Sequence, residues 1–250
     1  DVRRYVTPLR EGGSMPAIVE ADDDGLYVLK FRGAGQGTNA LVADWLGARL
    51  AQALELAAPR VALARLDGEL ARTEPDPEIQ HLIRASHGIN LAVDYLPGAL
   101  GFDAATMAVD ADTASRLVWL DALIENIDRT ARNPNLLLWH RVLRPIDHGA
   151  AFGFHHRWDA QAPVQLDEER VVRAFAAIAD HVLLPRATHI AELDAQLAAR
   201  LDDGVLRAAL DALPDDWLDA HGDPSRAQAR RDGYRRWLSR RLAAPRGFAR

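Results

Sequence analysis

The hydrophobic pattern of this chain changes its period near residue 96, and this change limits the folds open to it. Before that point, short runs of alternating apolar residues are bounded by turn residues, which is the pattern of β-strands. Strands are predicted over residues 4–8, 15–21, 26–31, 60–66 and 88–95. Residues 22–25 end in Asp-Gly and therefore predict a hairpin between the second and third strands.

Beyond residue 96 the apolar side chains recur mainly at helical spacing. Helices are predicted there over residues 112–125, 168–180, 186–202, 203–212 and 224–242. Two further helices, over residues 40–56 and 76–86, are predicted among the strands of the first region. Two short strands, 136–139 and 142–146, interrupt the helices beyond residue 96 as a hairpin. A β-rich part followed by a mostly helical part predicts an α+β chain of two lobes, residues 1–97 and 98–250.

Composition excludes several classes of protein. The chain has 250 residues, of which 48% are hydrophobic, so it can bury a sizeable core. It has no cysteine, which excludes disulfides and thiolate metal sites and fits a cytoplasmic protein. It also has no run of about 18 uncharged apolar residues, so no membrane span is expected. The first residues lack the pattern of a secretory signal.

The basic residues are divided very unevenly between two types. Lysine and arginine together number 30, and Lys30 is the only lysine. The two side chains differ where a compact point charge has to reach a phosphate. Lys30 is therefore a candidate for a chemical role.

A polar segment, residues 126–135, follows an apolar helix and precedes a short strand. It holds three of the five asparagines of the chain. Asp128 and Asn133 lie five positions apart, which is the spacing of a phosphoryl-transfer catalytic loop. Such a loop needs a carboxylate for the accepting hydroxyl and a neutral oxygen ligand for Mg²⁺. The alternative is a polar turn in which Asn and Asp cap a helix.

A second motif, Ile146-Asp147-His148-Gly149, lies fourteen residues after Asn133. An apolar strand there ends in Asp, followed by one residue and then Gly. This matches the element whose Asp ligates Mg²⁺ in kinases, and the hairpin between the two motifs also fits. The alternative is an ordinary Asp at the turn that follows a strand.

Lys30 completes the set because it lies on the third predicted strand. Gly12, Gly13 and Ser14 join the first two strands, and glycines there let backbone amides approach phosphate oxygens. A lysine on the third strand then neutralises phosphate charge and is usually held by a carboxylate on the next helix. Asp44 is the acid on that helix, although it is shorter than the usual Glu.

Together these motifs resemble the HipA-like kinases, a bacterial branch of the protein-kinase-like superfamily, and most closely a short, stand-alone type. The resemblance spans about residues 4–185. It rests on residues 4–14, 29–37, 126–135, 146–149 and 154–158.

The resemblance implies a two-lobed protein-kinase-like fold and a phosphotransferase that uses ATP and Mg²⁺. By this resemblance Asp128 is the catalytic base, Asn133 and Asp147 bind the metal, and Lys30 contacts phosphate. The hinge beside adenine would fall in residues 90–96. The residues implied in nucleotide binding are Gly12, Gly13, Ser14, Lys30, Asp44, Asp94, Tyr95 and Leu96.

The acceptor is left open by departures from ordinary protein kinases. Asn126-Ile127 replaces the usual His-Arg before the catalytic Asp, and no Ala-Pro-Glu element is present. A serine/threonine protein kinase is favoured, with a protein acceptor rather than a small molecule. The alternatives are a phosphoinositide or small-molecule kinase, and a nucleotide-binding module without transfer. A dinucleotide-binding βαβ unit is disfavoured, because the third glycine of residues 33–37 comes one position early.

The C-terminal end is basic although the net charge of the chain is −6. Residues 225–250 hold nine arginines against one acid, Asp232. The spacing on helix 224–242 predicts that Tyr234, Trp237, Leu238 and Leu242 are buried. An outward arginine face is predicted for Arg226, Arg230, Arg231, Arg235, Arg236, Arg240 and Arg241. We interpret this face as solvated and do not expect a nucleic-acid partner.

Overall fold

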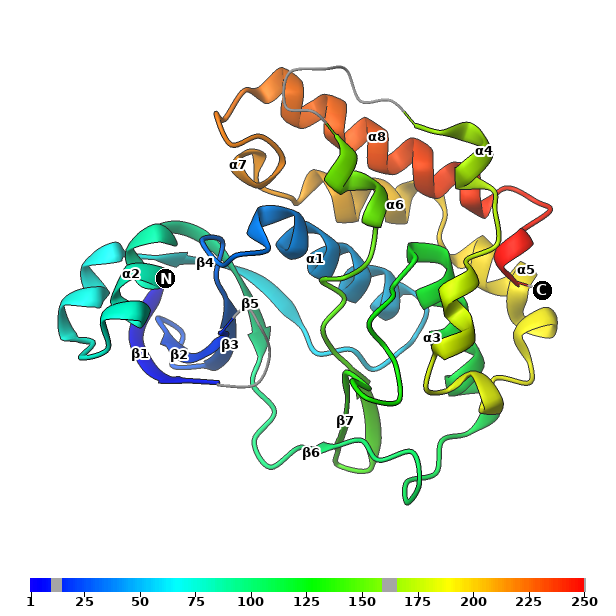
Figure 1. Ribbon diagram of the computed structural model, residues 1–250, viewed down its shortest axis with the longest axis horizontal. Helices are drawn as coiled ribbons and strands as arrows, with labels where there is room; N and C mark the ends of the chain where they lie inside the picture. Colours follow the sequence, from blue (N-terminus) through cyan, green and yellow to red (C-terminus); the bar gives the residue numbers. More distant parts are fainter. Residues whose placement is uncertain (10–14, 159–165, 250) are drawn as a thin grey trace.

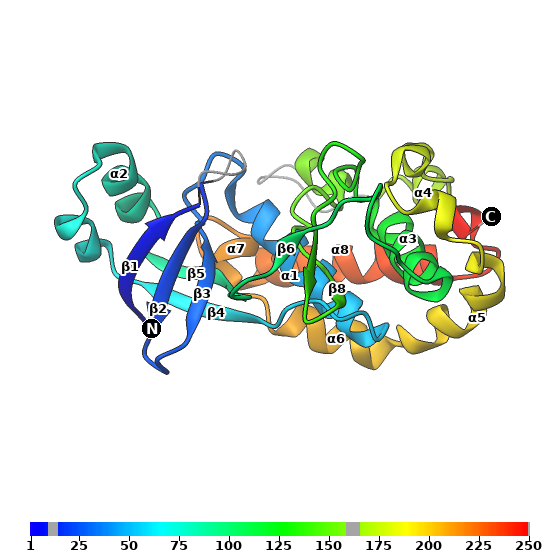
Figure 2. The same cartoon turned by 90° about the horizontal axis from the view of Figure 1, so that it is seen from below.

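The computed structural model describes residues 1–9, 15–158 and 166–249. Its N-terminal part is a five-stranded sheet in which all neighbouring strands are antiparallel. The spatial order is β1 (Val2–Pro8), β2 (Ala17–Ala21), β3 (Leu26–Lys30), β5 (Gly88–Asp94) and β4 (Val61–Leu66). Figure 2 shows this sheet, with α2 beside it, at one end of the molecule and most of the helices at the other.

Strand alternation gives the sheet one face for a small core. Along β2, Ala17, Val19 and Ala21 are buried, and the hairpin sets Ala17 opposite Leu29 of β3. Helix α2 (Pro77–Ala85) and the 3₁₀ helix η1 (Gly68–Thr73) pack against this face. The N-cap of α2 is Asp76, whose carboxylate accepts from the amides of the first turn.

The second core lies among the helices and includes α1 (Gly37–Ala53), although α1 follows the third strand in sequence. Trp45 of α1 donates its indole N–H to the carbonyl of Ala209 at 2.8 Å. Thr38 donates its hydroxyl to the carbonyl of Trp217 at the same distance. Both bonds join α1 to segments more than 160 residues later, so α1 links the sheet to the helical part.

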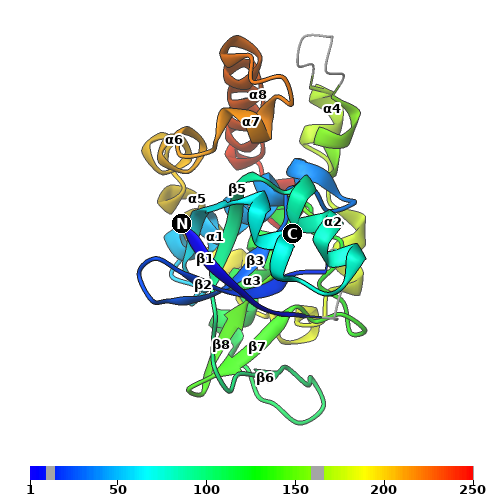
Figure 3. The same cartoon turned by 90° about the vertical axis from the view of Figure 1, so that its left-hand side faces the viewer.

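The helical part has α1 and α3 at its centre. On one side lie α6, α7 and α8, and on the opposite side lies a small sheet ordered β6-β7-β8 (Figures 1 and 3). The helices are α3 (Ala111–Ile124), α4 (Glu168–Val171), α5 (Ile190–Arg200), α6 (Asp203–Asp211), α7 (Asp215–Leu218) and α8 (Pro224–Leu242). The strands are β6 (Leu100–Gly101), β7 (Leu136–Trp139) and β8 (Val142–Pro145).

The predicted α+β architecture is confirmed, with an antiparallel sheet first and helices after it. The predicted hairpin corresponds to β7 and β8, and helix 224–242 corresponds to α8. The boundary between residues 97 and 98 stays a prediction. Among the described residues, no helix combines the length and apolar character that a bilayer crossing requires.

The predicted helix 168–180 is wrong. The chain there forms α4, then an irregular stretch, then the 3₁₀ helix η3 (Ala176–Asp180). The guanidinium of Arg241 donates to the carbonyl of Val171 at 2.8 Å and to that of Arg173 at 3.3 Å. These carbonyls bind a side chain of α8 in place of the amides of a continuing helix.

The outward position predicted for Arg241 is also wrong, since the residue is only 2% exposed. Besides Val171, its guanidinium donates to the carbonyls of Ala122 at 2.6 Å and Leu123 at 2.7 Å. These carbonyls belong to the last turn of α3, where a helix leaves them without backbone partners. The predicted burial of Tyr234, Trp237 and Leu238 is confirmed. Arg241 therefore joins α8 to α3.

We expect Arg241→Met to destabilise the protein strongly, because it leaves several buried carbonyls without donors. Each such group costs about 1–3 kcal/mol, so the expected loss in the free energy of unfolding is about 3 kcal/mol or more. Urea unfolding followed by circular dichroism measures it. The control is Arg3→Met at an exposed ion pair, with an expected change within about 1 kcal/mol. Equal effects of the two substitutions would contradict this role for Arg241.

Candidate active site

Lys30 ends β3 and points between two carboxylates from distant parts of the chain. Its Nζ forms an ion pair with Asp147 at 2.8 Å and a second, shorter one with Asp44 of α1. The lysine side chain is 15% exposed and that of Asp44 is buried. Three elements therefore meet at one ammonium group: β3, α1 and the turn after β8.

The charges of Lys30 and Asp44 stabilise each other in the ionised form. Burial opposes ionisation of Asp44, but Lys30 and a hydrogen bond from His148 outweigh it, and the pKa of Asp44 lies well below its usual range. Burial likewise opposes the charge on Lys30, and Asp44 and Asp147 reverse this and raise the pKa of the lysine. The site therefore keeps a charged ammonium across the physiological pH range.

Asp147 follows β8 in a left-handed backbone conformation, with φ of 53°. Such a conformation is uncommon outside glycine and is found where surrounding structure enforces it. Its carboxylate is 45% exposed. The next amide, that of His148, donates to Asp44 at 2.7 Å, so the turn is fastened to α1.

Gly47 allows α1 to lie this close to the turn. A Cβ atom at position 47 would come within 2.3 Å of the Cβ of His148, so any larger residue would displace one of the two segments. Gly47 was missed from the sequence, although a glycine inside an apolar helix is a signal of close packing.

The loop after α3 arranges Asp128 and its asparagines. The Asp128 carboxylate accepts from the side-chain amides of Asn133 at 2.8 Å and Asn135 at 3.3 Å. The Asp128 amide donates to the side-chain oxygen of Asn126 at 3.2 Å. Because Asn133 uses its amide nitrogen on Asp128, its side-chain oxygen is left for another partner.

A cavity of about 160 Å³ brings together five of the residues predicted from the sequence. These residues are Lys30, Asp44, Asp128, Asn133 and Asp147. Carboxylate and amide oxygens are the ligands that Mg²⁺ prefers, so Asp147 and Asn133 fit a magnesium ion chemically. Among the described residues there is no cluster of three or more His, Cys, Asp or Glu side chains suited to a metal, so a metal here would also need the amide oxygen of Asn133 and the phosphates.

The remaining predicted residues fall into two groups. Gly12, Gly13 and Ser14 lie outside the described residues. The other three line a separate hollow of about 270 Å³: Asp94, Tyr95 and Leu96. Asp94 forms an ion pair with Arg60 at 2.9 Å, and the amide of Tyr95 donates to the carbonyl of Leu26 at 3.1 Å.

A buried ion pair under the loop was also missed from the sequence. Arg129 and Asp121 of α3 form this pair, and both side chains are fully buried. His181 reaches the same carboxylate at 3.0 Å. The guanidinium of Arg129 also donates to the carbonyls of Asn135 and Ile146, the latter at 3.1 Å. Arg129 therefore fastens both ends of the β7–β8 hairpin to α3.

The family model for HipA-like kinases matches residues 2–243. The chain belongs to the HipA-like kinase family. This membership supports kinase-type phosphotransfer.

Two further comparisons were made for this HipA-like kinase. No curated protein matches it significantly. It is similar to the crystal structure of a Helicobacter pylori proinflammatory kinase, CtkA, with a TM-score of 0.48 and 13% sequence identity. That similarity covers 94% of this chain and 97% of the other.

We expect Asp121→Asn to destabilise the protein at pH 7 by about 3–5 kcal/mol, because Arg129 would keep a buried charge without its carboxylate. Burial raises the pKa of Asp121, but Arg129 and His181 lower it further, to a value well below its ordinary one. The ion pair thus contributes stability above about pH 4, the pKa of an unfolded Asp. That contribution is lost as the pH falls through the depressed folded pKa.

The difference in unfolding free energy between the wild type and Asp121→Asn should therefore shrink below about pH 4. Urea titrations at several pH values between neutral and acidic measure it. Asp211→Asn, at an exposed position, is the control and should show almost no difference at any of them. A wild-type advantage that stays constant from neutral to acidic pH would rule out this account of Asp121.

Proposed function

We propose that this HipA-like kinase transfers the γ-phosphate of ATP, with Mg²⁺, to a serine or threonine of a protein. The observation that carries the proposal is the placement of Lys30 between Asp44 and Asp147 in the cavity that also holds Asp128 and Asn133. A lysine, two metal-binding groups and a base are the parts that phosphoryl transfer needs.

Each residue has a distinct part in this mechanism. Lys30 binds phosphate oxygens, and Asp44 keeps its ammonium in place. Asn133 and Asp147 would hold Mg²⁺, which supplies positive charge against the phosphates. Asp128 orients the acceptor hydroxyl and takes its proton as the new bond to phosphorus forms.

In this mechanism the ion pair between Lys30 and Asp147 breaks when nucleotide binds. Asp147 is the more exposed of the two carboxylates and would be the one free to hold Mg²⁺ once nucleotide is bound. Lys30 then exchanges that carboxylate for phosphate oxygens and keeps Asp44. The ammonium thus has anionic partners both with and without nucleotide, which lowers the desolvation penalty of its burial.

The adenine end is proposed to lie toward Asp94, Tyr95 and Leu96. Strand β5 neighbours β3, and Leu91 is the register partner of Lys30. The chain therefore leads from the lysine directly along β5 to these residues. This placement is the one that the family resemblance implies.

A protein acceptor is favoured by the surface beside Asp128. The neighbouring Ile127 is 59% exposed although its side chain is entirely apolar. An apolar side chain next to the base can contact residues that flank the acceptor hydroxyl, which a small polar acceptor would not use.

Lys30→Arg should lower the rate of phosphate transfer by about 100-fold or more, although arginine takes every other basic position of the chain. The planar guanidinium is too large for a buried site between Asp44 and Asp147. Transfer is measured with radiolabelled ATP, on a general protein acceptor or as autophosphorylation. Arg3→Lys, an exchange at an exposed ion pair, is the control and should leave the rate unchanged. Near-normal transfer by Lys30→Arg would remove Lys30 from the mechanism.

Asp147→Asn and Asp128→Asn should separate binding from transfer. Loss of the metal-binding carboxylate should weaken Mg²⁺-dependent ATP binding by about tenfold or more, since the metal bridges protein and phosphates. Loss of the base should leave that affinity within a few-fold and lower transfer by about 10²–10⁴-fold. Calorimetry with and without Mg²⁺ measures the affinities. If both variants lose affinity equally, the two roles are assigned wrongly.

A further inference from the structure

The loop that follows β3 contacts a short helix from the C-terminal part of the chain. Arg32, two residues after Lys30, forms an ion pair with Asp216 of α7, and its guanidinium also donates to the backbone carbonyl of Asp216 at 3.4 Å. The side chain of Arg32 is 20% exposed. Figure 2 shows α7 where the sheet meets the helical part. This contact therefore joins the strand of Lys30 to the helices.

Trp217, the next residue of α7, contacts two further elements. Its buried indole donates its N–H to the carbonyl of Ile89 in β5 at 2.9 Å. Its own carbonyl accepts the hydroxyl of Thr38 in the first turn of α1 at 2.8 Å. Leu91, two residues after Ile89, is the register partner of Lys30, so the indole bond holds the strand beside β3.

The start of β5 is shaped to receive Arg32. Gly88 has a left-handed φ of 110°, and a Cβ atom there would lie 3.0 Å from a guanidinium nitrogen of Arg32. The backbone amide of Arg32 donates to the side-chain oxygen of Asn90 at 2.8 Å. Asn90 in turn donates to the carbonyl of Ser86 at 2.8 Å. Arg32 is thus fixed to the sheet at its backbone and to α7 at its guanidinium.

Helix α7 is itself held by the basic helix α8. Arg231 of α8 donates to the carbonyl of Leu213 and to the carboxylate of Asp215, each at 2.6 Å. It also donates to the carbonyl of Leu210, at the end of α6, at 3.2 Å. The side chain of Arg231 is only 11% exposed. Helix α7 therefore belongs to the helical part and reaches from it to the sheet.

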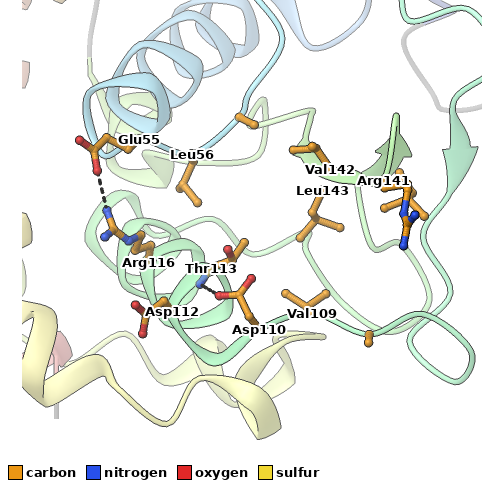
Figure 4. A pocket seen from close by; sticks show the side chains of 13 residues that line it. Glu55, Leu56, Val109, Asp110, Asp112, Thr113, Arg116, Arg141, Val142 and Leu143 are labelled. Atoms are coloured by element: carbon orange, nitrogen blue, oxygen red, sulfur yellow. Dashed lines mark hydrogen bonds and ion pairs between the residues drawn. The ribbon is translucent and has the colours of Figure 1, made fainter.

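The far end of α1 is fastened to the helical part separately. Arg116 of α3 donates to the carbonyl of Leu54 at 3.2 Å and pairs with Glu55 at 3.3 Å, just beyond the end of α1. Figure 4 shows this ion pair at the wall of a cavity of about 500 Å³. Helix α1 is thus held by helices at both ends, whereas β3 and β5 belong to the sheet. The position of the sheet relative to α1 depends on contacts such as those of α7.

We propose that Arg32, Asp216 and Trp217 are positioning residues for phosphate transfer. They hold β3 and β5 against the helical part, and this keeps Lys30 aligned with the catalytic loop. An ion pair at this exposure contributes little alone, but here it acts together with the indole bond to β5 and the hydroxyl bond to α1.

This inference rests on the proposed function, because that mechanism makes the α7 contacts necessary. When nucleotide binds, the ion pair between Lys30 and Asp147 breaks, and the sheet loses one link to the helical part. None of the α7 residues lines the catalytic cavity, so nucleotide does not replace their contacts. A misplacement of about 1 Å can lower the rate of a reaction about 100-fold, so this remaining link matters for transfer.

The first test measures the position of the sheet and needs no activity. The chain has no cysteine, so Ala62→Cys on β4 and Ala195→Cys on α5, both at exposed positions, place one spin label on each part. Pulsed electron spin resonance gives the distribution of distances between the labels. Asp216→Arg, which sets two guanidinium groups against each other, should broaden this distribution, and further so with an ATP analogue and Mg²⁺. Adding Arg32→Asp restores an ion pair and should narrow it again.

The second test measures transfer in the unlabelled chain. Asp216→Arg should lower the rate at saturating ATP by about tenfold, and the added Arg32→Asp should recover most of it. The affinity for ATP should stay within about threefold, because the groups that bind the phosphates and metal are unchanged. A loss of folded protein would not be reversed by a second charge change.

Two further variants guard against general effects. Trp217→Phe keeps an aromatic ring in the buried site and removes only the donor to Ile89, so it should broaden the distribution less than Asp216→Arg does. Asp24→Arg makes the same charge change at an exposed ion pair within the sheet and should alter neither readout. Thermal unfolding compares the folded fraction of all variants.

Three outcomes would overturn the proposal. The distance distribution could stay unchanged in both Asp216→Arg and Trp217→Phe, or it could broaden while the rate of transfer stays at the wild-type value. The double variant could also recover neither readout. A wild type that transfers no phosphate would instead overturn the proposed function, and the distance distributions would still decide whether α7 positions the sheet.

Discussion

The ammonium of Lys30, shared by Asp44 and Asp147, joins β3, α1 and the turn after β8. Burying one of these charges alone would cost several kcal/mol, so each needs the others in place. The left-handed backbone of Asp147 and the close contact at Gly47 are the local consequences of bringing the three segments together. The sheet and the helices are thereby held in the relative position that the cavity requires.

A second buried ion pair holds the loop that carries Asp128. Asp121 binds Arg129, and Arg129 binds the carbonyls of Asn135 and Ile146 at the two ends of the hairpin. Asp128 and Asp147 therefore both depend on α3, although neither side chain forms a hydrogen bond or ion pair with the described residues of that helix. Arg241 fixes the same last turn of α3 to α8, through the carbonyls of Ala122 and Leu123. Buried arginines thus hold the segments that carry Asp128 and Asp147.

The sequence predicted the parts of the fold and site that depend on local pattern. Alternation located β3 and Lys30, and the spacing of Asp128, Asn133 and Asp147 followed from the loop and the hairpin. The features that the sequence did not reveal depend on the tertiary contacts that a side chain makes. Arg241 repeats at the same spacing as the exposed Arg236 and Arg240, and Asp121 is an acid within a mostly apolar helix, so neither pattern reveals its buried partners. The false helix at 168–180 has the same cause, because its carbonyls bind Arg241 from α8.

A crystal structure with a non-hydrolysable ATP analogue and Mg²⁺ tests the central role of Lys30 most directly. The account predicts that Lys30 keeps Asp44, leaves Asp147 and contacts phosphate oxygens. It also predicts that Asp147 and Asn133 ligate the metal, with Asp128 facing the terminal phosphate. A complex in which Lys30 still pairs with Asp147 while the metal lies away from Asp147 and Asn133 would contradict it.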